Sequence, residues 1–367
     1  MSQTFDVSIL IRPHIQDMPA YEPILPFEVL SSQLNRSPKQ IIKLDANENP
    51  YGMLADVRAA LAEMPFPNVY PDPGSQELRH ALAEYHHIPY ENILAGAGAD
   101  ELIDLIFRLT IDPGDAIINC PPTFGMYSFD GDLNCARVIN VPRRTDFSLD
   151  LPAIESAVIR NQAKLIFIAS PNNPDGSLIS KSDLERVLAL PLLVVLDEAY
   201  VEFAQAGSSL LAEAPNRSNL VVLRTFSKWA GLAGLRIGFG VFPAGLMPHL
   251  WKIKQPYNVS VAASTAAIIS LKHGSELGQI GQCIIAERNR LYALLKTITF
   301  LQPYPSQSNF ILCRVIGMEA ASLKQSLARA GILVRYFNKP SLQDCIRISV
   351  GKPEHTDILI SVLSRPS

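Results

Sequence analysis

Short runs of apolar residues alternate with helical patterns between residues 92 and 240 of this chain. Two of these runs, at 165–169 and 192–196, are apolar at successive positions, without polar alternation. Strands of this kind are buried on both faces, as in a largely parallel sheet with helices on each side. The strands that the pattern predicts in this region are 92–95, 116–119, 137–141, 165–169, 192–196, 220–223 and 237–241.

The pattern differs on either side of this region. The first 45 residues are irregular and rich in proline, which predicts an arm that ends in a short strand at 41–44. Helices are expected at 55–64 and 75–86, the second with Ser75 as its N-cap. Beyond residue 256, the expected elements are helices at 260–297, 320–330 and the C-terminus, and strands at 309–314, 332–335 and 345–350. We therefore predict an α/β fold with a mostly parallel sheet sandwiched by helices, divided into an arm (1–45), a large domain (46–255) and a smaller α+β domain (256–367).

Composition and charge exclude several functional classes. Hydrophobic residues make up 48% of the chain and charged residues 18%, as in a well-buried globular protein. A net charge of −3 provides no basic surface for nucleic acid, and no apolar run is long enough for a membrane span. The five cysteines form no Cys-x-x-Cys pair, so neither a disulfide framework nor a metal site is expected. The first residues lack the pattern of a secretory signal, and we expect a cytoplasmic protein.

The richest candidate chemistry follows the strand at 220–223. A loop of small residues there contains Thr225, Ser227, Lys228 and Arg236. Hydroxyl and guanidinium groups suit a phosphate, and a lysine buried beside another cation has a lowered pKa and can form an imine. Taken alone, the loop is explained equally well as solvated surface charge.

Polar residues follow two neighbouring strands of the same predicted sheet. Asp197 and Tyr200 come after the strand at 192–196, and Asn173 after the strand at 165–169. A buried carboxylate needs a cationic partner, which a protonated pyridine nitrogen would supply, and tyrosine and asparagine can hydrogen-bond a ring oxygen. Ligands of such sheets bind at the carboxyl ends of the strands. Alternatively, Asp197 caps a strand–loop junction and Asn173 belongs to an ordinary turn.

Two further loops complete the pattern. Residues 96–100 open a helix whose amide groups can bind a phosphate. Glu101 stands where a dinucleotide fingerprint needs its third glycine, which favours a single phosphate over a pyrophosphate. Phe124 lies in a Pro/Gly loop after the strand at 116–119, where it either stacks on a flat heteroaromatic ring or belongs to the core.

In this order the segments resemble the fold type I pyridoxal-phosphate aminotransferases and, among them, the histidinol-phosphate aminotransferases. The resemblance covers essentially the whole chain. The segments that support it are Arg12-Pro-His-Ile with Tyr21, Asn47-Glu-Asn-Pro-Tyr-Gly52, Tyr70-Pro-Asp-Pro-Gly74, Pro121-Pro-Thr-Phe-Gly-Met-Tyr127, the Arg224–Arg236 loop, Pro256-Tyr-Asn-Val-Ser260 and Cys345-Ile-Arg-Ile-Ser-Val-Gly351.

The resemblance implies pyridoxal 5′-phosphate as the cofactor. Lys228 would be the Schiff-base lysine and proton carrier, and Asp197 would pair with the ring nitrogen. Asn173 and Tyr200 would hold the ring oxygen, and Phe124, where the family often has Tyr, would stack on the ring. The residues implied for the cofactor phosphate are Ala99 and Asp100 through their backbone, Thr225, Ser227, Arg236 and, from the neighbouring subunit, Tyr70. A homodimer with shared active sites follows from the last contact.

The substrate residues are also implied by the resemblance. Arg347 would bind the α-carboxylate of glutamate and then the phosphate of the other substrate, with help from Arg335. Tyr21 would close the pocket and Tyr257 would line it. Surface charge on small-domain strands is the alternative for both arginines. Many family members continue with Asp after this arginine, whereas this chain has Tyr336-Phe-Asn-Lys-Pro340.

The implied activity is amino-group transfer from L-glutamate to imidazole-acetol phosphate, which gives L-histidinol phosphate and 2-oxoglutarate in histidine biosynthesis. Three alternatives stay open at this point: an aromatic amino-acid aminotransferase, a threonine-phosphate decarboxylase, and a non-enzymatic regulator built on the same fold. Neither nucleic acid nor a membrane is expected as a partner.

Overall fold

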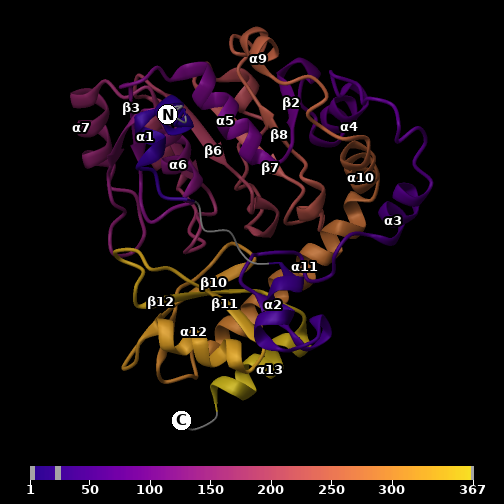
Figure 1. Ribbon diagram of the computed structural model, residues 1–367, viewed down its shortest axis with the longest axis vertical. Helices are drawn as coiled ribbons and strands as arrows, with labels where there is room; N and C mark the ends of the chain where they lie inside the picture. Colours follow the sequence, from indigo (N-terminus) through magenta and orange to yellow (C-terminus); the bar gives the residue numbers. More distant parts are fainter. Residues whose placement is uncertain (1–4, 21–25, 365–367) are drawn as a thin grey trace.

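The computed structural model describes residues 5–20 and 26–364, and it contains two sheets, each with its own helices (Figure 1). The larger sheet has the strand order β2-β8-β7-β6-β5-β3-β4. Its strands are β2 (Ile93–Gly96), β3 (Ala116–Asn119), β4 (Arg137–Asn140), β5 (Leu165–Ala169), β6 (Leu193–Asp197), β7 (Leu220–Thr225) and β8 (Gly238–Val241). All pairs are parallel except those that β8 makes with β2 and β7.

Helices cover both faces of the larger sheet because its central strands are apolar at successive positions. Neighbouring residues of a strand point to opposite faces, and Val195 and Leu196 of β6 accordingly belong to different core clusters. The helices of this half are α3 (Ala55–Ala62), α4 (Gln76–His86), α5 (Ala99–Thr110), α6 (Met126–Leu133), α7 (Leu151–Asn161), α8 (Lys181–Leu188), α9 (Met247–Ile253) and α10 (Val261–Lys272). Residues of α5, α6 and α9 pack on the Val195 face, and residues of α3, α4, α7, α8 and α10 on the Leu196 face.

The smaller sheet has the order β1-β11-β12-β10-β9. Its elements and their helices are β1 (Ile42–Leu44), β9 (Leu301–Pro303), β10 (Phe310–Val315), β11 (Ile332–Tyr336), β12 (Cys345–Ser349), α11 (Gly274–Leu295), α12 (Ala320–Arg329) and α13 (Pro353–Leu363). The strands pair antiparallel except β1, which runs parallel to β11. Residues 42–44, placed at the end of the arm by the sequence, therefore form part of the smaller sheet.

The N-terminal segment contacts both halves of the molecule (Figure 1). Arg12 precedes α1 (Pro13–Gln16) and donates from Nη2 to the Leu133 carbonyl at the end of α6, at 2.7 Å. Leu30 of α2 (Phe27–Leu34) packs with Leu333 of the smaller sheet. The division into 1–45, 46–255 and 256–367 stays a prediction.

One helix differs from the sequence expectation in its bounds, and another in the contacts at its N-terminus. The helix expected at 260–297 is divided into α10 and α11, which meet at His273. Ser75 is the N-cap residue of α4, as expected, but it has a left-handed backbone (φ 45°) and makes no side-chain cap. The Asp72 carboxylate accepts from the backbone N–H groups of Gly74 at 2.9 Å and Gln76 at 2.6 Å instead. Within the described residues, no helix is both long and apolar enough to cross a bilayer.

Candidate active site

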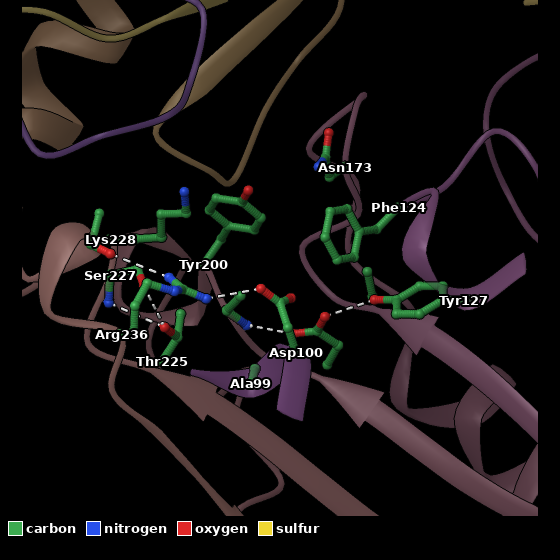
Figure 2. A pocket seen from close by; sticks show the side chains of 14 residues that line it. Ala99, Asp100, Phe124, Tyr127, Asn173, Tyr200, Thr225, Ser227, Lys228 and Arg236 are labelled. Atoms are coloured by element: carbon green, nitrogen blue, oxygen red, sulfur yellow. Dashed lines mark hydrogen bonds and ion pairs between the residues drawn. The ribbon is translucent and has the colours of Figure 1, made fainter. Parts of the chain in front are cut away.

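A cavity lies at the carboxyl ends of β5, β6 and β7, beside the first turn of α5 (Figure 2). We call it the inner cavity. Parallel strands all end at one edge of a sheet, so side chains that are far apart in the sequence meet there. The predicted site residues that line it are Ala99, Asp100, Phe124, Asn173, Asp197, Tyr200, Thr225, Ser227, Lys228 and Arg236.

Asp197 ends β6 and is buried at the floor of the inner cavity. Its Oδ2 accepts a hydrogen bond from the Tyr127 hydroxyl at 2.7 Å, and its Oδ1 accepts from the Ala199 amide at 3.0 Å. Burial raises the pKa of Asp197 to about 6, because desolvation disfavours the carboxylate. A cationic group that enters the cavity would restore the charged form.

Lys228 lies in the loop after β7, and its Nζ donates to the Ala46 carbonyl at 3.1 Å. Burial, with a smaller contribution from the positive charge of Arg347, lowers the pKa of Lys228 to about 8. A lysine in this state has a substantial neutral fraction near physiological pH. It can therefore act as a nucleophile and accept a proton.

The end of the inner cavity at Arg236 suits a phosphate. Arg236 donates from Nη2 to Asp100 Oδ2 at 2.9 Å, and the hydroxyls of Thr225 and Ser227 are 2.9 Å apart. Helix α5 begins beside them, and the first amide groups of a helix have no partner within it. A Cβ on Gly98 would lie 2.5 Å from Arg236 Nη2, so the guanidinium would have to move if another residue stood there. This donor set fits one phosphate group.

Glu101 stands where a dinucleotide site would have its third glycine, and its carboxylate accepts two hydrogen bonds there. Its Oε2 accepts from the Ala97 amide at 2.6 Å and from Asn258 Nδ2 at 2.7 Å. The carboxylate thus ties the loop before α5 to Asn258.

Figure 2 shows Phe124 and Asn173 on the side of the inner cavity away from Lys228 and Arg236. Tyr200 lies between these two groups of residues. The Tyr200 hydroxyl accepts from Asn47 Nδ2 at 3.1 Å. Asn173 Oδ1 accepts a hydrogen bond from Arg347 Nη1. Aromatic rings and amide groups thus face the space between the lysine and the buried carboxylate.

A second cavity, which we call the outer cavity, adjoins the first and shares Phe124, Asn173, Tyr200 and Lys228 with it. It continues to Arg347 of β12 and to Arg335, its register partner in β11. Lys339 lines the same cavity and was not found by sequence reasoning.

These cations make the outer cavity suitable for anions. Among the described residues, Arg335 and Lys339 form no ion pair with a carboxylate. Arg347 is buried and donates from Nη2 to the Asp45 carbonyl at 2.8 Å, and the Phe337 ring lies 5.8 Å from Arg335 and 5.6 Å from Arg347. Cations that face a cavity without acidic partners attract an anionic ligand.

Two predicted residues that the structure describes, Tyr70 and Tyr257, are not brought into either cavity. Tyr70 and Tyr257 stack on each other with ring centroids 4.8 Å apart, and their exposed fractions are 80% and 45%. Neither lines the inner or the outer cavity of this chain. Tyr21 lies outside the described residues.

A buried ion cluster connects two strand ends behind the inner cavity. Arg224 precedes Thr225 in β7, and it pairs with Glu198, the residue after Asp197, at 2.9 Å and with Glu202 at 2.7 Å. The arginine and Glu198 are both buried. Sequence reasoning missed this cluster because the charges that form it come from separate segments.

The comparisons with known proteins agree with this site. A family model of aminotransferase class I and II matches residues 39–363. Histidinol-phosphate aminotransferase 1, chloroplastic, of Arabidopsis thaliana is 55% identical over 356 residues, which cover 97% of this chain and 85% of the relative. The histidinol-phosphate aminotransferase of Roseiflexus castenholzii is 50% identical over 96% of this chain and 97% of its own length. This chain belongs to the histidinol-phosphate aminotransferase family.

A solved structure supports the same family assignment. The histidinol-phosphate aminotransferase from Sinorhizobium meliloti, in complex with pyridoxal-5′-phosphate, is similar with a TM-score of 0.89 and 29% identity. The alignment covers 99% of this chain and 98% of that one. The predicted family and the fold type I architecture are thereby confirmed.

Proposed function

We propose that this histidinol-phosphate aminotransferase transfers an amino group between L-histidinol phosphate and 2-oxoglutarate, with pyridoxal 5′-phosphate as its cofactor. The products would be imidazole-acetol phosphate and L-glutamate, and the reverse direction would serve L-histidine biosynthesis. The observation that carries the proposal is the presence of Lys228 and the buried Asp197 in one phosphate-compatible cavity that adjoins a second, cationic cavity.

The inner cavity would hold the cofactor. When bound, pyridoxal phosphate supplies two groups: an aldehyde, which takes up an amino group, and a ring, which accepts electrons. The Asp197 carboxylate would face the ring nitrogen, Asn173 and Tyr200 the ring oxygen, and Phe124 the ring face. The groups that would hold the phosphate are the backbone of Ala99 and Asp100 with the side chains of Thr225, Ser227 and Arg236.

Lys228 would serve as nucleophile and proton carrier. Its lowered pKa, about 8, supports a neutral amine that accepts the proton leaving the amino-bearing carbon of the substrate. The Ala46 carbonyl accepts from Nζ and keeps the amine within the cavity. Burial of Asp197 supports a strong electrostatic interaction with a cation, because little water screens it.

The outer cavity would bind the two substrates in turn. Arg347 offers a planar fork for the glutamate carboxylate, and Arg335 and Lys339 add positive charge for the phosphate of histidinol phosphate. Lys339 Nζ lies close to Gly125, which also lines the outer cavity, because it would be 3.6 Å from a Cβ at that position.

We also propose a homodimer with shared active sites. Tyr70 would reach the cofactor phosphate of the neighbouring subunit, and Tyr257 and Tyr21 would complete the substrate pocket. The Tyr70–Tyr257 stack is exposed, and Phe66 and Val69, which are close to Tyr70 in the sequence, are exposed as well. This exposure supports a surface that a second copy of the chain covers.

We place the enzyme in the cytoplasm of its cell. All five of its cysteines are free, as expected in a reducing compartment. Cell fractionation tests this placement, and recovery of the protein from an organelle would contradict it.

The reaction is tested by incubating the cofactor-loaded enzyme with L-histidinol phosphate and 2-oxoglutarate and measuring glutamate. Lys339→Ala should raise the KM for histidinol phosphate about 10- to 100-fold, because a charge-assisted contact contributes about 1.5–3 kcal/mol. Lys324→Ala, which removes an exposed lysine of α12, is the matched control and should leave KM unchanged. A comparable kcat/KM for phenylalanine, or carbon dioxide release from threonine phosphate, would contradict the assignment.

A further inference from the structure

Two asparagines at the edge of the larger sheet have no role in the function proposed above. Asn119 ends β3, Asn140 ends β4, and they are partners in the parallel register of these strands. Asn119 donates from Nδ2 to Asn140 Oδ1 at 2.8 Å. Both side chains line the outer cavity, which also contains Lys228 and the two arginines.

The remaining hydrogen-bonding capacity of this amide pair is unused within the described part of the chain. Asn119 is 7% exposed, and its Oδ1 has no hydrogen-bond partner there. Asn140 is exposed, and its Nδ2 likewise makes no hydrogen bond with the described residues. A buried amide oxygen without a partner is costly, so mutual pairing alone does not account for the two side chains.

Apolar and polar side chains both line the outer cavity. The apolar ones include Pro121, Pro122, Phe124, Pro142, Phe337 and Leu342, and Thr123, Ser128 and Ser341 line it as well. A planar ring can pack against the apolar side chains, and the amide pair offers it hydrogen bonds at the edge of the sheet.

The sheet order places the amide pair beyond the reacting groups. From β6, which ends in Asp197, the strands follow as β5, β3 and β4. Neighbouring strands lie about 4.8 Å apart, so Asn119 and Asn140 are roughly 10 and 14 Å from Asp197 along the edge. A cofactor ring above β6 and a substrate side chain that extends from it would span this distance.

We propose that the Asn119–Asn140 pair is the subsite for the side-chain ring of the substrate and that it selects a neutral nitrogen heteroaromatic ring over a phenyl ring. Asn140 Nδ2 donates to the bare ring nitrogen, while Asn119 orients Asn140 and brings its own unpaired oxygen to the ring N–H. The inference rests on the proposed function and specifies its substrate class. A phenyl ring has no group that can hydrogen-bond to either amide, so both amides would stay unpaired when it binds. Unpaired polar groups of this kind let a site reject a phenyl substrate strongly in favour of a nitrogen heteroaromatic one.

The test compares two substrates that share an amine and a phosphate and differ only in the ring: L-histidinol phosphate and L-phenylalaninol phosphate. With the cofactor-loaded enzyme, Asn140→Ala and Asn119→Ala should lower kcat/KM for histidinol phosphate 10- to 100-fold. The same variants should leave kcat/KM for phenylalaninol phosphate within about twofold of the unsubstituted enzyme. Lys339→Ala is the matched control and should lower both values equally.

Equal losses for both substrates, or no loss for either, would overturn the subsite. Asn140→Leu keeps the size of the side chain without its hydrogen-bonding groups, so it gives the same comparison if the alanine variant folds poorly. If the unsubstituted enzyme transfers the amino group of neither phosphate substrate, the proposed function fails and the subsite with it. Turnover of histidinol phosphate with unchanged ring preference in the variants overturns the subsite alone.

Discussion

Asp197 is buried and Lys228 is half-buried in the inner cavity, and desolvation moves their pKa values toward neutrality from opposite sides. The pKa of Lys228 falls to about 8 and that of Asp197 rises to about 6. Desolvation disfavours the charged form of each group, which lowers the pKa of an amine and raises that of a carboxylic acid. The lysine is thus prepared to react, and the aspartate is prepared to ionise when a cation enters the cavity.

This difference predicts a pH dependence for cofactor uptake. Only the neutral amine reacts with an aldehyde, so the neutral fraction of Lys228 should rise with pH through its pKa of about 8. Stopped-flow absorbance after mixing cofactor-free protein with pyridoxal phosphate should show a rate that increases between pH 7 and 9. Lys228→Ala should show no lysine-bound cofactor band at any pH. A midpoint near that of an ordinary lysine would contradict the assigned environment.

At the same scale, the sequence identified the site residues that carry distinctive chemistry but not those that orient them. Ten predicted residues line the inner cavity, and their individual roles stay predictions. Tyr127 was quoted only as part of a motif, and its hydrogen bond to Asp197 depends on how α6 packs against the sheet. Ser75 is the N-cap residue of α4, as expected, but the side chain that accepts from the first backbone N–H of the helix is Asp72, three residues earlier.

The junction between β2 and α5 shows how an element shapes the site. Gly98 precedes the helix with φ 83° and ψ 172°, a backbone conformation available mainly to glycine. Its missing Cβ leaves space for the Arg236 guanidinium beside the first turn of α5. The phosphate-compatible end of the cavity therefore depends on a single residue type at this position.

Alanine substitutions of Gly98 and of a control glycine should distinguish the effect of backbone strain on stability from the effect on cofactor binding. Gly98→Ala should cost about 1–3 kcal/mol of folding free energy and, because the Cβ displaces Arg236, weaken pyridoxal phosphate binding at least tenfold. Gly114→Ala is the matched control: its φ is also positive (92°), but nothing lies within 4 Å of the added Cβ. Thermal denaturation and cofactor titration measure the two effects. Equal cofactor affinity in both variants would contradict the assigned phosphate site.

The strand pattern located the elements well but not their directions. Buried apolar runs predicted the seven strands of the larger sheet, and a largely parallel sheet is confirmed. The antiparallel direction of β8 was not predicted, because an apolar run looks the same in either direction. The break between α10 and α11 was also missed. There, Gly274 lies against the Tyr85 ring, a contact between distant segments.

For the whole molecule, the exposed Tyr70–Tyr257 stack is the feature that supports the proposed homodimer. Tyr70 is 80% exposed and lies outside both cavities of its own chain. The proposed homodimer would cover it and bring it to the cofactor phosphate of the other subunit.

Hybrid dimers test this arrangement. Tyr70→Ala homodimers should be weakly active and Lys228→Ala homodimers inactive. In a hybrid of the two variants, one site combines an intact Lys228 with the partner's intact Tyr70, so up to half of the activity of the unsubstituted dimer should return. Activity assays on purified, differently tagged hybrids measure the rescue, and sedimentation checks the dimer. Hybrids no more active than the Tyr70→Ala homodimer would place the tyrosine in its own subunit's site or outside any site.

The sequence by itself determined the family and the fold class of this protein, and it predicted the reactive residues. Those features are local: a buried strand is a run of apolar residues, and Lys228, Asp197 and Asn173 each follow such a run within five residues. The tertiary structure alone decided how separate segments meet. It joined residues 42–44 to the C-terminal sheet, brought Lys339 to the outer cavity and paired Asn119 with Asn140. These contacts depend on strand order and on the packing of distant elements, neither of which has a signature in a local stretch of sequence.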